Sequence, residues 1–355
     1  MAPQMQSSLR THRERRRSWR TPSSPPAGFT LALGGGAARG WSHVGVLRAL
    51  EEGGLRPRRI VGTSMGALVG LFAAADKLEA LHAAGLALDR RALLSFLDVA
   101  IPRAGLIDGK RLRALLREHV TATDFDDLQV PFCAVAACLE TGEEVLLDRG
   151  DPIEAVRASI SVPGLFRPVC HEGGTLVDGG LVNPVPVNVA RDSGAGIVVA
   201  VDVNHYVVEE RPYLTTLEAP TAKQAPVEQG DVVDESVADG GGFRLPAPLR
   251  RLAPSLSWPS WAQGFGGGRV SRIAEAHSPS IVEVLLSSIA VSEVTLSRLR
   301  LKAYPPDVLI RPRVGHIRFL DFHRAAEAFD AGHQAGVEAL PFITSLLPSV
   351  HGRGG

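Results

Sequence analysis

The sequence is poor in cysteine and lysine. Its 355 residues include three Cys and four Lys. Three cysteines (Cys133, Cys138 and Cys170) cannot close a disulfide framework, and two of them lie in an apolar, strand-like run, so we expect small buried thiols in a reducing compartment. The shortage of lysine reflects a preference for arginine among the basic residues and indicates no particular chemistry.

The sequence also has no excess of charge of either sign. The 38 Lys and Arg residues balance the 38 Asp and Glu residues, which argues against a protein whose main task is to bind nucleic acid. Hydrophobic residues make up 45% of the chain, too many for a wholly disordered protein and enough for a sizeable core. The length alone fits two domains or one large α/β domain.

No apolar segment is long enough to cross a bilayer. The longest one near a motif, 60–75, is interrupted by Gly, Thr and Ser and is too short. No apolar stretch of the signal-peptide type follows the basic run between Arg10 and Arg20, which holds six Arg and one acid. We therefore expect a cytoplasmic protein with a disordered, Pro/Ser-rich head over 1–27, whose arginines can also contact anionic lipid at a membrane surface.

Strand and helix patterns alternate from residue 28 onward, which predicts parallel βαβ units. Predicted strands cover 29–33, 59–62, 131–137, 176–178, 197–203 and 308–310, and predicted helices cover 44–52, 65–75, 108–119, 281–301 and 321–340, with another beginning at Asp151-Pro152. The pattern stops between about 207 and 272, where Pro, Gly, Asp and Ser are frequent. We interpret this stretch as an irregular insertion in one domain, 28–345, followed by a flexible tail over 346–355.

The sharpest motif is Gly62-Thr63-Ser64-Met65-Gly66, a G-x-S-x-G between a predicted strand and a predicted helix. A serine on such a tight turn has a strained backbone that projects its Oγ above the sheet, and the two glycines leave room for the neighbouring strand and helix. The start of a helix also favours developing negative charge. Because the required strand–turn–helix context is present, we predict that Ser64 is a nucleophile.

A glycine-rich loop, 34–40, directly follows the first predicted strand. Glycines there let successive backbone N–H groups converge on one anion. A dinucleotide fingerprint would need glycine at Arg39, and a P-loop would need lysine at Trp41, so both phosphate-binding interpretations fail. An oxyanion hole has no such side-chain requirement, and glycines needed only for a close turn are the alternative.

A third motif, Asp178-Gly179-Gly180, lies at the end of a predicted strand. A serine hydroxyl is a weak nucleophile and needs an adjacent base, and Asp followed by two glycines can present a carboxylate in an open turn. An Asp-Gly turn is common by itself. The interpretation of Asp178 as a base therefore depends on the other two motifs.

Together the three motifs resemble the patatin-like phospholipase family, especially its bacterial branch and the catalytic domain of neuropathy target esterase. Further matching stretches are 40–47, 157–163 and 178–186, and the likeness covers about 29–204 and resumes over about 279–340. The resemblance implies an α/β fold, a patatin-like three-layer α/β/α sandwich with a mostly parallel central sheet. The domain over 28–345 is then the catalytic domain.

The resemblance also implies a serine acyl hydrolase that cleaves phospholipids or lysophospholipids through a Ser–Asp dyad, with no metal or organic cofactor. Ser64 would attack the acyl carbonyl, and Asp178 would accept its proton and return it to the leaving alcohol. The oxyanion would be held by N–H groups around Gly34, Gly35 and Gly36, and the supporting motif positions are Arg39, Gly40, Gly62, Gly66, Gly179 and Gly180.

The glycine loop departs from the family's pattern, because two alanines rather than one residue precede Arg39. Either the loop is one residue longer, or Ala37 stands where the family has its third glycine. His43 matches a family histidine just inside the first helix, and we expect it to have a packing or loop-orienting role.

Other functions stay open on the residues alone. An ordinary α/β-hydrolase has a histidine after its acidic residue, and such an esterase or thioesterase could use one of four histidines: His205, His316, His323 and His333. A non-catalytic, anion-binding regulatory protein is a further alternative. In the insertion, Trp258 and Trp261 suit a lipid interface, a lid or core packing.

Overall fold

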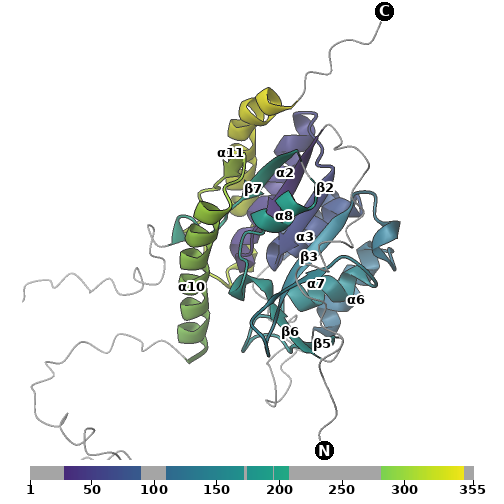
Figure 1. Ribbon diagram of the computed structural model, residues 1–355, viewed down its shortest axis with the longest axis vertical. Helices are drawn as coiled ribbons and strands as arrows, with labels where there is room; N and C mark the ends of the chain where they lie inside the picture. Colours follow the sequence, from purple (N-terminus) through teal and green to yellow (C-terminus); the bar gives the residue numbers. More distant parts are fainter. Residues whose placement is uncertain (1–27, 89–108, 172–173, 195, 208–280, 348–355) are drawn as a thin grey trace, which may run out of the picture. The chain divides into compact units, whose positions relative to one another are not determined.

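The computed structural model describes residues 28–88, 109–171, 174–194, 196–207 and 281–347 (Figure 1). In chain order, with η for a 3₁₀ helix, its elements are β1 (Phe29–Leu33), η1 (Ala37–Trp41), α2 (Ser42–Glu52), β2 (Arg59–Thr63), α3 (Met65–Ala74), α4 (Leu78–Ala87), α6 (Lys110–His119), η2 (Phe125–Asp127), β3 (Phe132–Cys138), β4 (Glu144–Leu147), α7 (Pro152–Ser159), β5 (Val169–His171), β6 (Gly174–Asp178), η3 (Gly179–Leu181), α8 (Val187–Asp192), β7 (Ile197–Val201), α10 (Ile281–Ala303), β8 (Val308–Ile310), η7 (Phe322–Arg324) and α11 (Ala325–Leu346).

The strands form one eight-stranded sheet in the order β5-β6-β3-β2-β1-β7-β8, with β4 paired to β3. The central pairs β3–β2, β2–β1, β1–β7 and β7–β8 are parallel. The pairs β3–β4, β3–β6 and β5–β6 are antiparallel. The central strands are almost wholly apolar, as expected for parallel strands buried on both faces.

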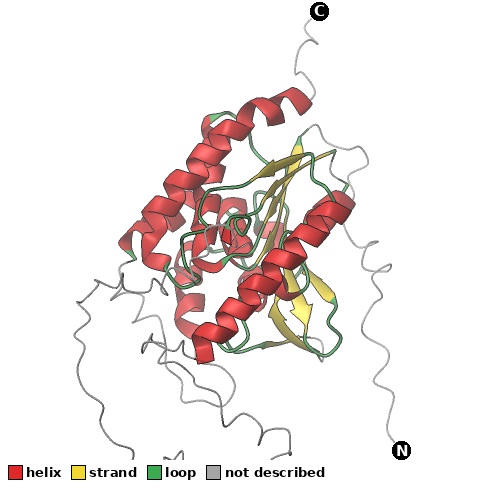
Figure 2. Cartoon of the chain, turned by 90° about the vertical axis from the view of Figure 1, so that its left-hand side faces the viewer, coloured by secondary structure: helices red, strands yellow, loops and turns green. Residues whose placement is uncertain are grey.

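Helices cover both faces of the sheet (Figure 2). Alternate residues of β1 define the two faces: Leu31 and Leu33 pack into the larger core with apolar residues of α2, α3, α7 and α11, whereas Ala32 faces a second core. Val187 of α8 and Leu301 of α10 contribute to that second core. The predicted three-layer α/β/α sandwich with a mostly parallel sheet is confirmed.

Several element boundaries differ from the sequence-based expectation. The helix expected from Asp108 begins at Lys110 with Gly109 as its N-cap residue at φ 76°, and Asp108 lies outside the described residues. The last helix was expected over 321–340, but η7 precedes it and α11 continues past Pro341 to Leu346. This extension buries Ile343 completely, which offsets the backbone hydrogen bond that a proline cannot make.

The three cysteines are free. Cys133 and Cys138 are buried in β3 as expected, whereas Cys170 is exposed in β5. The expectation of a buried thiol is therefore wrong for Cys170, because its short strand lies at the edge of the sheet, where little of the chain covers it.

The head over 1–27 and both tryptophans of the insertion, Trp258 and Trp261, lie outside the described residues, as does nearly all of the stretch 207–272. The proposed domain limits and the membrane contacts of these segments thus stay predictions. In the described ranges, no helix combines the length and the hydropathy needed to cross a membrane.

Candidate active site

Strand β3 brings the predicted nucleophile and the predicted base together. Thr63, the last residue of β2, pairs with Val135 on β3, and Asp178, the last residue of β6, pairs with the next residue, Ala136. Ser64 follows Thr63 directly. Because these strands end at neighbouring positions, two residues that are 114 positions apart meet above one point of the sheet.

Ser64 lies on a strained turn and contacts Asp178 directly. Its φ and ψ of 55° and −124° are unusual for a non-glycine residue. Its Oγ donates a hydrogen bond of 2.5 Å to Asp178 Oδ2, and both side chains are buried. The backbone N–H of Ser64 donates to Ser159 Oγ at 2.8 Å, and Ser159 Oγ donates in turn to the Val135 carbonyl.

Asp178 is held by its own turn. Its Oδ1 accepts the Gly180 N–H at 2.7 Å, and its backbone N–H donates to the Ser161 carbonyl at 3.0 Å. Burial raises the pKa of Asp178 from 3.8 to about 6, although the hydrogen bonds from Ser64 and Gly180 act in the opposite direction. The carboxyl group therefore titrates close to the pH range in which a general base is most effective.

The glycines of the serine motif allow close approach of α3 to the strands. A Cβ on Gly62 would collide with the Gly66 carbonyl, and a Cβ on Gly66 would collide with the Leu33 carbonyl at the end of β1. Backbone atoms cannot move aside as a flexible side chain can. The motif therefore fixes the position of Ser64 relative to the glycine loop that follows β1.

We expect Gly66→Ala to lower the free energy of unfolding by about 1–3 kcal/mol, the usual cost of forcing an extra methyl group into a packed site. Urea unfolding followed by circular dichroism measures this change. Gly196→Ala is the matched control, because nothing lies within 4 Å of the position of its added Cβ. Equal stability of the two variants would contradict the steric explanation.

The glycine loop has two halves with different hydrogen bonding. The N–H groups of Gly34 and Gly35 donate to the carbonyls of Val201 and Pro184 at 3.0 and 2.8 Å. In the described part of the chain, no hydrogen bond from the N–H of Gly36 or Ala37 is found. The expectation that Gly34 and Gly35 supply free donors is corrected accordingly, because the chain beyond β1 continues to pair with neighbouring segments.

Ala37 has a φ of 48°, in the left-handed region that favours glycine. Of the two alternatives for this loop, the conformation favours the one in which Ala37 occupies a glycine-like position. The side chain of His43 also holds the loop, because its Nε2 donates a hydrogen bond of 2.7 Å to the Gly34 carbonyl. Burial lowers the pKa of His43 to about 4 despite that hydrogen bond, so the ring is neutral at neutral pH.

Arg39 anchors the same loop to two other segments. It is completely buried, and its Nε donates to Asn204 Oδ1 at 3.0 Å while its Nη1 donates to the Ile317 carbonyl at 3.1 Å. Asn204 Nδ2 donates to the Gly35 carbonyl at 3.0 Å. The guanidinium group of Arg39 thus holds the loop in position. At the next residue, Gly40, an added Cβ would collide with the side chain of Met65.

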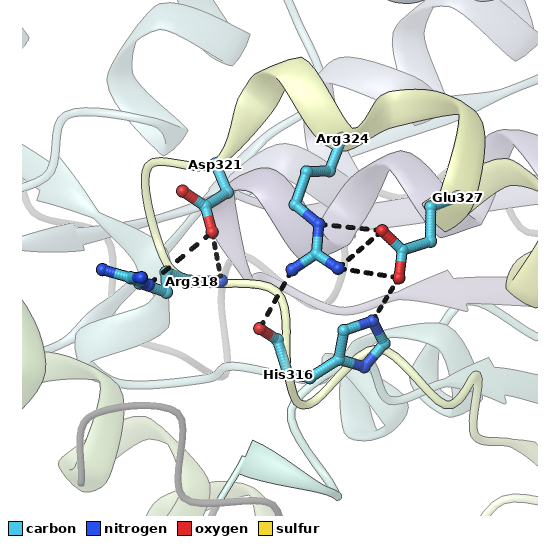
Figure 3. A network of polar contacts seen from close by, with 5 residues as sticks. All are labelled: His316, Arg318, Asp321, Arg324 and Glu327. Atoms are coloured by element: carbon cyan, nitrogen blue, oxygen red, sulfur yellow. Dashed lines mark hydrogen bonds and ion pairs between the residues drawn. The ribbon is translucent and has the colours of Figure 1, made fainter. Parts of the chain in front are cut away.

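Polar contacts also fix the turn around Ile317, whose carbonyl accepts a hydrogen bond from Arg39 (Figure 3). His316 Nε2 lies 2.5 Å from Glu327 Oε1, and Arg324 binds the same carboxylate through Nε and Nη2, each at 2.8 Å. Arg324 Nη1 also donates to the His316 carbonyl. Because the Phe319 carbonyl of this turn accepts the Ala38 N–H at 3.1 Å, these contacts indirectly support the glycine loop.

The histidines that follow Asp178 make other contacts. His316 is paired with Glu327, and His333 Nε2 lies 2.8 Å from Glu52 Oε2. The rings of His205 and Tyr206 meet edge to face. Among the hydrogen bonds found for Ser64 and Asp178 in the described ranges, none involves a histidine.

The structure adds three residues that sequence reasoning did not single out. Ser159 accepts the Ser64 N–H, and it lies inside the family-like stretch 157–163, so a signal for it was present. Asn204 and Glu293 lie beside the loop and the Asp178 turn, with no local pattern to mark them. No cluster of three or more His, Cys, Asp and Glu side chains suited to a metal ion is found among the described residues.

Comparison with known proteins identifies relatives of this chain. The model of the family described as "Patatin-like phospholipase" matches residues 31–191. An uncharacterized NTE family protein of Mycobacterium tuberculosis is 32% identical over 347 residues, which cover 90% of this chain and 93% of that protein. A second such protein of M. tuberculosis is 36% identical over 89% of this chain and 47% of its own length.

A eukaryotic relative shares the same region. The rat "Patatin-like phospholipase domain-containing protein 7" is 34% identical over 181 residues, 49% of this chain and 13% of the rat protein. A patatin-type α/β sandwich with a serine on a strand–turn–helix motif defines the general class. The chain belongs to the patatin-like phospholipase family, with relatives in its NTE group, and this membership implies a lipid acyl hydrolase.

Proposed function

We propose that the protein hydrolyses fatty-acyl esters of phospholipids or lysophospholipids with a dyad of Ser64 and Asp178. The observation that carries the proposal is the 2.5 Å hydrogen bond between Ser64 Oγ and Asp178 Oδ2. A nucleophile is activated by a base within hydrogen-bond reach, and Asp178 is the ionisable group that Ser64 Oγ contacts. Family membership supports the reaction class.

In the first half-reaction, Ser64 Oγ attacks the carbonyl carbon of the ester while Asp178 Oδ2 accepts its proton. The bond from that carbon to the leaving alcohol oxygen then breaks, and Asp178 returns the proton to the alcohol. In the second half-reaction, Asp178 accepts a proton from water, whose oxygen attacks the acyl-enzyme. The fatty acid leaves, Ser64 regains its proton, and the sum is ester plus water giving acid plus alcohol.

Backbone N–H groups are proposed to hold the oxyanion. Within the loop, the N–H groups of Gly36 and Ala37 are the ones for which no other acceptor is found among the described residues. Met65, at the first position of α3, adds an N–H that cannot bond within its own helix. Donors of this kind contribute about 3 kcal/mol each to lowering the barrier, and the start of a helix adds a favourable dipole.

We propose that the acyl chain of the substrate lies beside Ala37. Ala37 belongs to an apolar cluster with Leu165, Ile289 and Phe319, which come from three different parts of the chain. An apolar wall beside the reacting carbonyl favours a fatty-acyl group over a short polar one. Head group, acyl position and chain length are best determined by offering purified protein a panel of phospholipids, lysophospholipids and acyl thioesters.

The rate of labelling by a fluorophosphonate probe, measured against pH, tests the dyad. The probe reacts with an activated serine, so the wild-type protein should be labelled, and mass spectrometry should locate the label on Ser64. Because Asp178 must be ionised to accept the proton and its pKa is about 6, the rate should rise as the pH increases through about 6. A protein that takes up no label would contradict the proposal.

A further inference from the structure

A second buried carboxyl group, Glu293, lies beside the proposed dyad. It projects from α10 and is 5% exposed, although other residues of the same helix, such as Val291, are about half exposed. Acidic side chains are almost never fully buried unless they have partners. Neither the family-like motifs nor the proposed chemistry accounts for this residue.

The second glycine of the Asp-Gly-Gly turn brings Glu293 and Asp178 together. A Cβ on Gly180 would collide with Glu293 Oε1 and would stand 3.1 Å from Asp178 Oδ1. Glu293 Oε1 and Asp178 Oδ1 therefore both lie next to the position that a Gly180 Cβ would occupy. Glycine at this position is what allows the carboxyl group of α10 to approach the turn that carries the base.

A polar chain links Glu293 to the glycine loop on its other side. Asn204 Nδ2 lies 3.5 Å from Glu293 Oε2 and donates to the Gly35 carbonyl at 3.0 Å. Asn204 Oδ1 accepts from Arg39 Nε. The side chain of Glu293 thus lies between the two parts of the proposed site, the base and the oxyanion loop, so a change in its charge would affect both.

Two carboxyl groups so close in a buried site do not both ionise easily. Burial and the neighbouring charge of Asp178 raise the pKa of Glu293 from 4.5 to about 8, while Arg39 and Asn204 act in the opposite direction. The preceding turns of α10 pack against apolar residues of other segments: Ala37, Val162, Leu165 and Phe319. Among the described residues, Asp178 and Arg39 are the charged groups whose interaction shifts the pKa of Glu293.

We propose that Glu293 is a positioning residue that retains its proton while Asp178 is ionised, and that its own ionisation at higher pH switches the dyad off. The proposal rests on the dyad of the proposed function. A neutral Glu293 leaves one negative charge in the site, where Asp178 needs it. An ionised Glu293 adds a second negative charge beside the loop that must stabilise an oxyanion, which opposes the reaction.

The test compares labelling of Ser64 by the fluorophosphonate probe in the wild type and in Glu293→Gln between about pH 5 and pH 10. The wild type should give a bell-shaped profile, with midpoints near 6 and near 8. The glutamine amide mimics the protonated carboxyl group, so the acid limb should stay and the alkaline limb should disappear. At one pH unit above the alkaline midpoint, the variant should be labelled about tenfold faster than the wild type.

Ser297→Ala is the matched control, because Ser297 is also buried on α10, one turn further along. Its profile should equal that of the wild type, and it also reports any hydrolysis of the probe at high pH. If Glu293→Gln does not fold, Glu293→Asp withdraws the carboxyl group by one methylene and should shift the alkaline midpoint.

The outcomes separate the two proposals. Absence of labelling in the wild type contradicts the proposed function itself. A labelled wild type without an alkaline limb, or an unchanged alkaline limb in Glu293→Gln or Glu293→Asp, overturns the role of Glu293 and leaves the dyad intact.

Discussion

Replacement of Ser64 by alanine is expected to lower the rate of acyl-ester hydrolysis by about 10⁴-fold or more, because the variant has no atom that can form the acyl-enzyme. Labelling by the fluorophosphonate probe should be lost as well. Water attacking directly on an ester held in the intact oxyanion loop sets the residual rate. Release of fatty acid from a lysophospholipid, followed continuously, measures the effect.

Ser193→Ala is the control for this experiment. Ser193 is buried like Ser64, and its Oγ donates to the Ala190 carbonyl at the end of α8, away from the Asp178 turn. The control should hydrolyse substrate and take up label as the wild type does. Equal labelling of the wild type and of Ser64→Ala would show that another residue is the nucleophile.

The fold class and both members of the proposed dyad could be predicted from the sequence, because the three motifs occur in order and together carry the resemblance to the family. The serine motif needs a strand, a turn and a helix, and its glycines need close approach to backbone, as the Leu33 carbonyl beside Gly66 illustrates. Asp178 ends a strand, and the antiparallel register of β6 on β3 then brings it to Ser64. The order and spacing of the motifs indicate the family, whereas the register that joins the two residues is seen in the structure.

The sequence did not predict which N–H groups of the glycine loop are free to bind an oxyanion. Glycines indicate that N–H groups can turn inward, but the groups that do so depend on distant carbonyls. The N–H groups of Gly34 and Gly35 donate to the carbonyls of Val201 and Pro184, which lie 167 and 149 residues further along the chain. The open question about Ala37 likewise needed its φ, since an alanine can adopt either hand of backbone at a modest energetic cost.

The burial of Glu293 could not be predicted from the sequence either, because it also depends on distant segments. It stands in the middle of a helical pattern, where an acidic residue usually faces solvent, and its separation from Asn204 is 89 residues. Its burial follows from how α10 packs against η3, next to a glycine without a side chain. A buried charge is a property of tertiary contacts, so a single sequence gives no signal for it.

Replacement of Asp178 by asparagine is expected to lower hydrolysis by about 10²–10⁴-fold, the range that a positioned general base contributes. The asparagine side chain keeps the shape and can still accept the Gly180 N–H, but it cannot accept the Ser64 proton. His323→Ala and His333→Ala are the paired controls and should retain activity near that of the wild type. Full activity of Asp178→Asn, with loss in a histidine variant, would instead favour a triad.

The stability of Asp178→Asn gives an independent measurement on the same variant. Burial raises the folded-state pKa of Asp178 from 3.8 to about 6, so the folded wild type binds this proton more tightly than the unfolded chain does. Its stability therefore falls as the pH rises through this window, because ionisation then favours the unfolded state. The asparagine variant has no such loss. Its melting temperature relative to the wild type should increase from about pH 4 to about pH 8, and a pH-independent difference would show that Asp178 is not held in a buried site that disfavours its charge.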